Sequence, residues 1–244
     1  MRAVTSNMKT PKYKRVIIKL SGEALATANG SGIDYAKLSA VCDQIIEVKN
    51  LGVEVGIVIG GGNFWRGRQA DSEMNRTTAD HMGMLATIIN ALAVQDCLER
   101  KGVPVRVQTA ITVTKVAEPY ILRKAMRHLE KGRIVVFACG TGNPYFSTDT
   151  GAALRAAEIG ANALLLAKNV DGVYDSDPKT NPDAVKFDSL TYMQVISKGL
   201  KAMDTTAITM CMDNSIPIIA FDLNAENGIK RAVLGEKIGT YIGK

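Results

Sequence analysis

The residues in this sequence best suited to chemistry are polar side chains that follow short apolar runs and stand next to glycines. Lys19 lies near the end of the apolar run 16–20, directly before Ser21 and Gly22. A lysine inside an apolar strand should not be buried without an anion to meet, so Lys19 is a candidate for binding a phosphate group. A lysine whose ammonium reaches solvent from an edge strand has the same sequence pattern, and this alternative stays open on Lys19 alone.

Three consecutive glycines, Gly60 to Gly62, end the next buried run, 53–59. The backbone N–H groups of such a turn can lie against a bound phosphate. Arg66 follows, where its guanidinium could reach a phosphoryl group during transfer; a surface arginine on a loop is the alternative. The sequence contains neither a GxxxxGK[ST] phosphate loop nor a GxGxxG dinucleotide fingerprint.

A third candidate is the segment 140–149, between the apolar run 134–138 and an alanine-rich stretch. Ser147, Thr148 and Asp149 are good residues for starting a helix, and the free backbone N–H groups at a helix start can face an anion. A plain turn of Gly, Asn and Pro residues is the alternative.

These groups together fit the transfer of a phosphoryl group. A lysine, a glycine cluster, an arginine and a helix start can hold two phosphates in line and neutralise the charge that moves between them. If the acceptor is itself a phosphate, its second pKa near ~6 leaves it largely deprotonated at pH 7, so no general base is required. His81 is more readily explained as structural than as catalytic. The four cysteines have no CxxC spacing and fit small buried side chains, so we predict no metal site on the protein itself.

The elements that must position these residues alternate between strands and helices. We predict strands at 13–20, 53–59, 103–107, 134–138, 163–167, 216–221 and 239–242, and helices at 34–50, 77–100, 120–130, 151–159, 191–200, 204–214 and 225–234. This alternation predicts an α/β fold, a three-layer αβα sandwich around a mostly parallel sheet. The glycine-rich loops would then lie along one edge of that sheet.

The composition limits the classes of protein and partner. With 244 residues and 46% hydrophobic content, the chain can bury a large core. The net charge of +6 and a pI of about 9.1 favour anionic partners. The basic residues are scattered and aromatics make up 5%, so nucleic-acid binding is the minority interpretation. No apolar run is long enough for a membrane span or a signal peptide, and we expect a cytoplasmic protein without a membrane partner.

At this point the motifs resemble those of the bacterial uridylate kinase family within the amino-acid-kinase superfamily. The resemblance runs from about Lys12 to the C-terminus, in matching order and spacing, and defines one amino-acid-kinase-like domain, 12–244. Residues 1–11 form an N-terminal extension outside it, which could be ordered or disordered. The segments that carry the resemblance are 19–23, 59–63 with Arg66 and Gly67, 79–85, 140–149, 170–174 with Asp177 and Pro178, and 201–204.

The resemblance implies that ATP phosphorylates UMP to UDP, a step of pyrimidine nucleotide biosynthesis, with Mg2+ arriving on ATP. It implies catalytic roles for Lys19, Arg66 and Asp149. It implies ATP contacts by Lys19, Leu20, Ser21, Gly22, Gly62, Arg66, Lys168, Asn169, Tyr174 and Asp177. It implies UMP contacts by Gly61, Asp80, Thr141, Gly142, Asn143, Pro144, Tyr145, Phe146, Ser147 and Thr148, with Asp80 on the ribose hydroxyls. The pair Lys168 and Asn169 differs from the pairs typical of the family, so which of the two contacts adenosine stays open.

The family also implies a homohexamer, inhibition by UTP and activation by GTP. Asp96, Arg106 and Arg133 resemble its GTP-site residues, but Glu99 stands where some members carry histidine, so GTP activation stays open. UTP inhibition follows more directly, because UTP can occupy the UMP pocket.

Three other hypotheses remain at this stage. A kinase for acetylglutamate, aspartate or carbamate would share the fold, but the loop 141–148 together with Asp80 suits a nucleotide better than an amino acid. A basic regulator that binds nucleic acid would show steeply salt-dependent affinity and no special need for Lys19. A scaffolding protein would gain nothing from three glycine-rich loops at strand ends.

Overall fold

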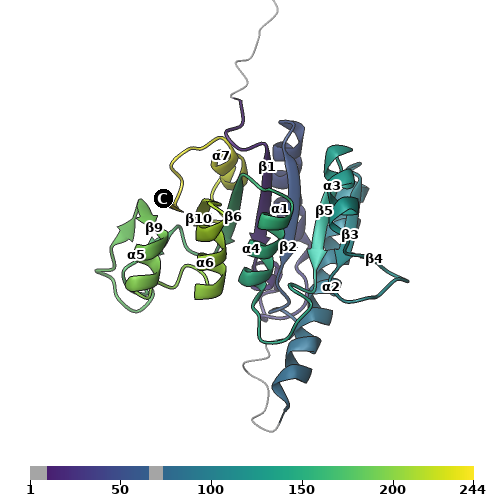
Figure 1. Cartoon of the computed structure of the whole chain (residues 1–244), viewed down its shortest axis with the longest axis horizontal. Coiled ribbons are helices and arrows are strands. Elements are labelled where there is room, and N and C mark those ends of the chain that lie inside the picture. The colour runs from purple at the N-terminus through teal and green to yellow at the C-terminus, as the bar shows by residue number, and fades with distance from the viewer. Residues whose placement is uncertain (1–9, 66–73) are drawn as a thin grey trace, which may run out of the picture.

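The structure is a computed structural model that describes residues 10–65 and 74–244. Its described residues form a nine-stranded sheet in the order β4-β3-β5-β2-β1-β6-β10-β11-β9, which runs through the middle of the molecule (Figure 1). At its centre lie four parallel strands: β1 (Arg15–Leu20), β2 (Glu54–Ile59), β5 (Ile134–Ala138) and β6 (Ala163–Lys168). The outer strands are β3 (Val105–Thr109), β4 (Glu118–Pro119), β9 (Ser189–Thr191), β10 (Ile218–Asp222) and β11 (Thr240–Gly243). Among these strands only β10 and β11 pair antiparallel, so the prediction of a mostly parallel sheet is confirmed.

Helices cover both faces of the sheet, and two separate core clusters lie beneath them. One cluster joins the sheet to α1 (Tyr35–Asn50), α2 (Arg76–Arg100) and α7 (Gly228–Val233). The other joins it to α3 (Leu122–Glu130), α4 (Thr148–Glu158), α5 (Tyr192–Ser197) and α6 (Thr205–Asp213). Because the central strands are buried on both faces, they read as continuous apolar runs and not as alternating ones. The predicted three-layer αβα sandwich is confirmed.

Polar caps set where the helices begin. Asp34 caps α1, accepting hydrogen bonds from the backbone N–H groups of Ala36 (3.0 Å) and Lys37 (3.2 Å), so the helix predicted from 34 begins at Tyr35. The alanine-rich helix α4 begins at Thr148, earlier than the predicted 151, because the Ser147 hydroxyl already caps its first turn. The predicted helix 191–200 is too long: α5 ends at Ser197, before Gly199 adopts a left-handed φ of 61°.

Several short elements were not predicted, since each is too short to leave a periodic pattern. They are the 3₁₀ helix η1 (Gly22–Leu25), strands β4 and β9, and a separate two-stranded sheet of β7 (Val173–Tyr174) with β8 (Lys186–Phe187). The segment 170–174, which carries part of the resemblance, therefore contains the short strand β7.

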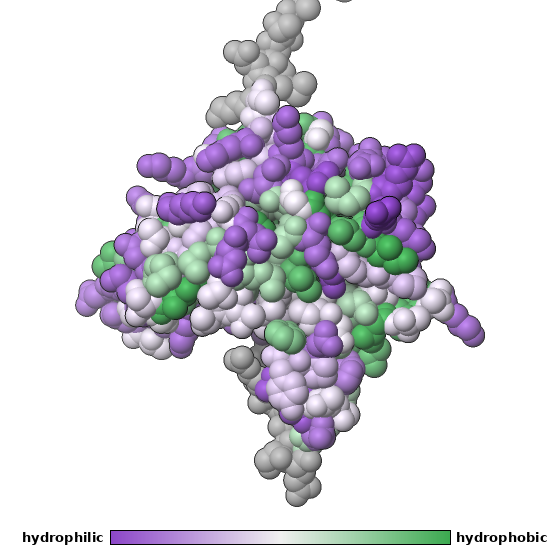
Figure 2. Space-filling model, viewed as in Figure 1, coloured by the Kyte–Doolittle hydropathy of each residue, from purple (hydrophilic) through white to green (hydrophobic). Residues whose placement is uncertain are grey.

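The four cysteines, Cys42, Cys97, Cys139 and Cys211, are free and buried, as predicted. Burial raises the pKa of the Cys211 thiol to about 12, so this sulfur is neutral at pH 7. No helix in the described part of the chain is long and apolar enough to cross a membrane. Figure 2 shows hydrophilic side chains over the upper part of one face, with scattered hydrophobic areas between them.

Candidate active site

An ion pair between Lys19 and Asp149 lies at the carboxyl edge of the central strands. Lys19 is the second-last residue of β1, and Asp149 is in the first turn of α4. The Lys19 Nζ lies 2.9 Å from the Asp149 Oδ1, and the two side chains are 14% and 22% exposed. Lys19 is on a central strand, so the alternative of a lysine pointing to solvent from an edge strand is wrong. The ammonium is held beside a helix N-terminus, an arrangement suited to an anionic ligand.

Asp204 connects the start of α4 to the start of α6. Its carboxylate accepts hydrogen bonds from the hydroxyls of Ser147 and Thr150, the latter at 3.0 Å, and from the backbone N–H of Ala207 at 3.0 Å. Ser147 in turn accepts from the backbone N–H groups of Asp149 and Thr150. The predicted cap at Ser147 is confirmed, but Asp204 was not predicted as a site residue.

Lys168 ends β6 on the other side of the same edge. Its Nζ donates hydrogen bonds to the carbonyl oxygens of Lys201 (3.1 Å) and Ala202 (2.6 Å). Burial lowers the pKa of the Lys168 ammonium, the charge of Asp149 opposes this effect, and the charge of Lys19 adds to it. Two lysines and one aspartate therefore share this part of the site.

Two buried asparagines hold the glycine turn after β2. The Asn90 amide on α2 donates to the carbonyl oxygen of Gly60 and to the Asn63 Oδ1, both at 2.7 Å. The Asn63 amide donates back to Asn90 at 3.0 Å and to the carbonyl oxygen of Gly32 at 2.7 Å. A Cβ on Gly61 would lie 2.7 Å from the Ala86 Cβ, so only glycine lets the turn pack this closely against α2.

Gly22 allows the loops after β1 and β2 to touch, and we expect its replacement by alanine to separate them. A Cβ at Gly22 would lie 2.5 Å from the Gly60 oxygen and 2.6 Å from the Asn63 Oδ1. Overpacking of this kind costs roughly 1–3 kcal/mol, so Gly22→Ala should lower the free energy of unfolding by about that amount and reduce activity. Urea unfolding measures it. Gly62→Ala is the matched control, because its Cβ would meet Glu23 at an ordinary 3.5 Å, and an equal loss in both variants would contradict the steric argument.

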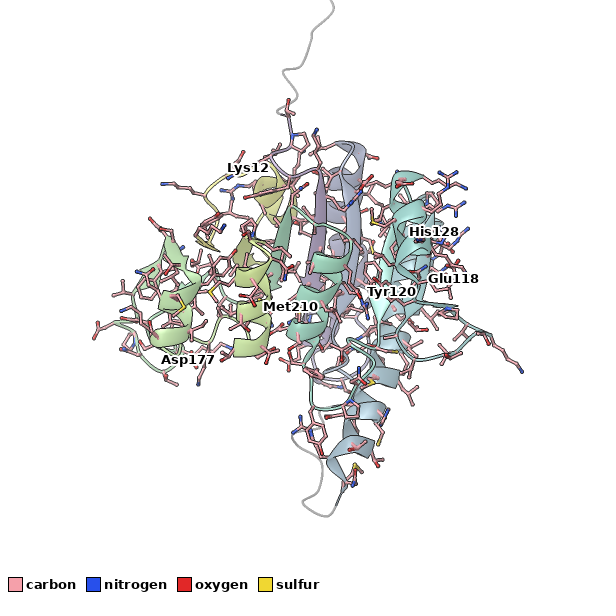
Figure 3. The ribbon with its side chains drawn as sticks, in the orientation of Figure 1. Lys12, Glu118, Tyr120, His128, Asp177 and Met210 are labelled. Atoms are coloured by element: carbon pink, nitrogen blue, oxygen red, sulfur yellow. The ribbon has the colours of Figure 1, made fainter. Side chains whose placement is uncertain are left out.

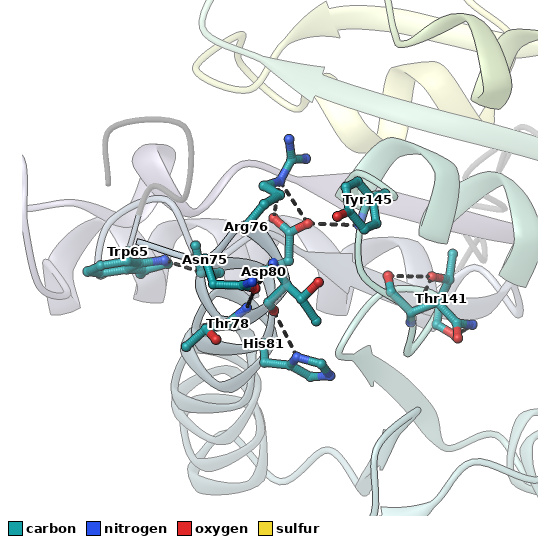
Figure 4. A network of polar contacts seen from close by, with 11 residues as sticks. Trp65, Asn75, Arg76, Thr78, Asp80, His81, Thr141 and Tyr145 are labelled. Carbon is teal, nitrogen blue, oxygen red and sulfur yellow. Dashed lines mark hydrogen bonds and ion pairs between the residues drawn. The ribbon is translucent and has the colours of Figure 1, made fainter. Parts of the chain in front are cut away.

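Asp80 connects the first turns of α2 to the loop 141–148. Its carboxylate accepts hydrogen bonds from the Arg76 Nε at 2.9 Å and from the backbone N–H of Tyr145 at 2.8 Å (Figure 4). The Arg76 guanidinium carbon also lies 5.4 Å from the centre of the Tyr145 ring. The His81 Nδ1 lies 2.8 Å from the carbonyl oxygen of Thr77, within its own helix. Asp80 is therefore aimed at the loop, and in this structure two protein donors take up part of its acceptor capacity.

A cleft of about 780 Å³ brings most of the predicted residues together. The predicted residues in its lining are Lys19, Gly61, Gly62, Asp80, Thr141, Asn143, Tyr145, Phe146, Ser147, Thr148, Asp149 and Lys168. Predicted residues that the structure places outside this lining are Leu20, Ser21, Gly22, Gly142, Pro144, Asn169, Tyr174 and Asp177. The Tyr174 hydroxyl donates instead to Asp171 at 2.7 Å. Arg66 lies outside the described residues.

Several lining residues were missed from the sequence, among them Glu23, Trp65, Arg76 and Asp204. The segment 201–204 was part of the resemblance, and this was the available signal for Asp204. Arg76 and Trp65 carry no such signal, since an arginine or tryptophan near a helix start is common on any surface.

The residues predicted for a GTP site lie away from the cleft. Arg106 lies 3.8 Å from Glu118, and Arg133 reaches the same carboxylate through His128, with 3.0 Å at each step (Figure 3). Asp96 forms an exposed ion pair with an arginine one turn later on α2. The structure thus joins Arg106 and Arg133 in one charged cluster and leaves Asp96 in a separate pair.

The comparisons with known proteins assign the fold to a kinase family. The model of the amino acid kinase family matches residues 14–222, so the chain belongs to this family. A UMP kinase from Bacillus anthracis is 41% identical, with 95% of this chain and 96% of that chain covered and a TM-score of 0.92. A UMP kinase from Ureaplasma parvum is 39% identical, with 95% and 99% covered and a TM-score of 0.90. A uridylate kinase from Archaeoglobus fulgidus is 28% identical, with 93% and 99% covered and a TM-score of 0.73. Within the family, the chain groups with these UMP kinases.

Proposed function

We propose that this chain transfers the γ-phosphoryl group of ATP to the phosphate of UMP, forming ADP and UDP. The observation that carries the proposal is the single cleft in which the Lys19–Asp149 pair faces the loop 141–148 and Asp80. The names of the similar structures, all kinases of UMP, support the same substrate. These three names do not include a kinase of acetylglutamate, aspartate or carbamate.

In the proposed mechanism the protein positions phosphates and neutralises charge. The Lys19 ammonium binds oxygens of the phosphoryl group during its transfer, and the Asp149 carboxylate orients that ammonium. Arg66, outside the described residues, is proposed to reach the same group. The backbone N–H of Gly61 is proposed to add a donor, and the positive end of the α4 dipole is proposed to attract the phosphates. The UMP phosphate attacks as an anion, so no side chain has to remove a proton.

Magnesium is proposed to enter with ATP. The described residues contain no group of three or more histidine, cysteine or acidic side chains that could hold a metal ion. This fits an ion held mainly by phosphate oxygens and water, which is the usual preference of Mg2+ at phosphate-transfer sites. When bound, Mg2+ would neutralise charge on the β- and γ-phosphates.

The loop 141–148 is proposed to select the acceptor. Its backbone groups would read the uracil edge, and Asp80 would accept hydrogen bonds from the ribose hydroxyls. Lys168, which lies in the cleft lining, is proposed to contact ATP, and Asn169, Tyr174 and Asp177 are proposed to enclose adenosine; which of Lys168 and Asn169 contacts adenosine stays open. UTP is proposed to inhibit by occupying the UMP site. A homohexamer, a cytoplasmic location and a GTP response through Asp96, Arg106 and Arg133 are also proposals.

Asp80→Asn is expected to weaken the binding of UMP more than the binding of ATP. Asparagine keeps an oxygen for the Tyr145 N–H but loses the charge that strengthens hydrogen bonds from ribose, which should raise the KM for UMP roughly tenfold. The KM values for both nucleotides measure the effect. Asp43→Asn, in an exposed ion pair with Lys101, is the control. An unchanged KM for UMP would contradict the ribose assignment.

The direct test is ADP release by the purified protein with Mg-ATP and a panel of acceptors. UMP, CMP, dUMP, AMP, GMP, acetylglutamate, aspartate and carbamate should each be supplied, with and without UTP or GTP. Turnover with UMP that UTP suppresses would support the proposal. Turnover only with an acid acceptor would refute it and keep the fold assignment, whereas no turnover with any acceptor would favour the nucleic-acid-binding alternative.

A further inference from the structure

Arg155 is the one charged residue that is buried in the part of the chain that the structure describes, with 5% of its surface exposed. It lies on α4 behind the cleft and is not part of the cleft lining. Its Nη1 donates to the Glu158 carboxylate on the same helix, and its Nη2 donates to the carbonyl oxygen of Gly140 at 3.2 Å. A cation in such a place needs partners on every side, so its geometry is restricted.

Tyr120 completes the surroundings of this guanidinium. The guanidinium carbon lies 3.8 Å from the centre of the Tyr120 ring, and the Tyr120 hydroxyl donates to the same Glu158 carboxylate at 2.7 Å. The ring also packs edge-on against Phe137 of β5, with centroids 5.8 Å apart. In Figure 3 Tyr120 lies beside this part of the sheet, close to β5. Stacking and hydrogen bonding together hold the planar guanidinium in one orientation, which a lysine could not reproduce.

The loop 141–148, called the acceptor loop below, follows β5 through Cys139 and Gly140. The backbone at these two residues has an uncommon conformation. Cys139 and Gly140 are successive left-handed residues, with φ values of 67° and 54°. A left-handed conformation is unfavourable for a residue with a side chain such as Cys139, and it persists only when its surroundings enforce it. α4 packs directly against this turn, since a Cβ at Gly151 would lie 2.8 Å from the Gly140 Cα. On the other side of the turn, the Thr87 hydroxyl of α2 accepts a hydrogen bond from the Cys139 N–H at 2.8 Å.

We propose that Arg155 is a positioning residue for the acceptor loop. By fixing the Gly140 carbonyl from behind, the guanidinium keeps the left-handed turn in place, and residues 141–148 then face the cleft in the arrangement that receives the acceptor. The ligand named for this loop rests on the proposed function above, but the effect of Arg155 on the loop conformation does not.

Arg155→Met tests the proposal with two readouts. In the ligand-free protein, hydrogen exchange of the amides in 139–147 should become faster, because the loop has lost the restraint at Gly140. With substrates, the KM for UMP should rise roughly tenfold or more, as expected for losing a hydrogen bond to a charged group, with the KM for ATP changed less than about twofold. Arg155→Lys keeps the charge beside Glu158 and should show the same two changes to a smaller extent.

Arg15→Met is the matched control. Arg15 also pairs with a glutamate, Glu54, and donates to a backbone carbonyl, that of Ile159 at 2.6 Å, which caps the C-terminal end of α4 and is not part of the loop 141–148. This variant should lose stability without a change in loop exchange or in the KM for UMP. Equal changes in the Arg15 variant, or unchanged exchange in a folded Arg155→Met protein, would overturn the proposal. If Arg155→Met does not fold, Arg155→Lys decides by the same criteria. If the wild-type protein does not phosphorylate UMP, the proposed function fails while the exchange comparison still tests Arg155.

Discussion

Replacing Lys19 by methionine is expected to lower kcat for UMP phosphorylation by roughly 10²–10³-fold, the usual effect of removing a group that stabilises charge in a transition state. The Lys19 Nζ lies in the cleft lining, where the proposed mechanism places the phosphates, beside Asp149 and the start of α4. Methionine keeps most of the apolar stem that packs inside β1, so the fold should remain. Single-turnover kinetics with saturating ATP and UMP would separate a loss of chemistry from a loss of binding.

Lys101→Met is the control for the loss of a lysine in an ion pair. Lys101, at the C-terminal end of α2, pairs with Asp43 of α1 at 2.7 Å, and neither residue lines the cleft. We expect its kcat to equal that of the wild type. A Lys19→Met enzyme that retains kcat within about threefold would show that the ammonium does not serve the transition state, since even one charged hydrogen bond is worth more than that.

Local sequence signals were sufficient for the framework of the site. Lys19, the glycines 60–62 and Ser147 each follow or end an apolar run, and parallel strands bring the ends of such runs to one edge. The order of the elements was therefore enough to predict that these residues meet. The cap at Ser147 needed only the residue type and the helix that follows it.

The partners that complete the site come from distant parts of the chain, and no local pattern reveals them. Asp204 reaches Ser147 across 57 positions, Asp80 reaches Tyr145 across 65, and Tyr120 reaches Glu158 across 38. Each contact depends on how two helices or loops pack, which composition and periodicity do not determine. The short strands β7 and β8 were missed for a related reason, because two residues cannot show a period.

For Asp80, the sequence predicted a carboxylate at the site but not the protein groups that hydrogen-bond to it. The resemblance implied a carboxylate that accepts hydrogen bonds from ribose, whereas in the structure Arg76 and the Tyr145 N–H already occupy it. Ribose hydroxyls would have to share or displace these donors. The tip of the acceptor loop and the first turns of α2 are therefore linked before any ligand arrives, and binding at Asp80 would rearrange that link.

Asp149→Asn is expected to lower kcat by roughly 10–100-fold, because Lys19 would lose the charged partner that fixes its direction. The loss of the Asp149 charge also affects the pKa of Lys168. The Asp149 charge raises the pKa of the Lys168 ammonium against the lowering effect of burial, so asparagine should shift that pKa further below the ordinary lysine value. The alkaline limb of the kcat profile should then move to lower pH, with Asp43→Asn, in the exposed pair with Lys101, as the control.

The lowered pKa of Lys168 also makes the free energy of unfolding depend on pH. A lysine with a lowered pKa in the folded state binds fewer protons there than when unfolded, so its contribution to stability rises with pH from that lowered pKa up to the ordinary value near ~10.4. Asp149→Asn should extend this rise to lower pH, as measured by urea unfolding from neutral to alkaline pH. If neither the kcat profile nor the stability profile moves, Asp149 acts on Lys19 alone. A shift in both would mean that the Asp149 carboxylate orients the Lys19 ammonium and also keeps the Lys168 ammonium charged.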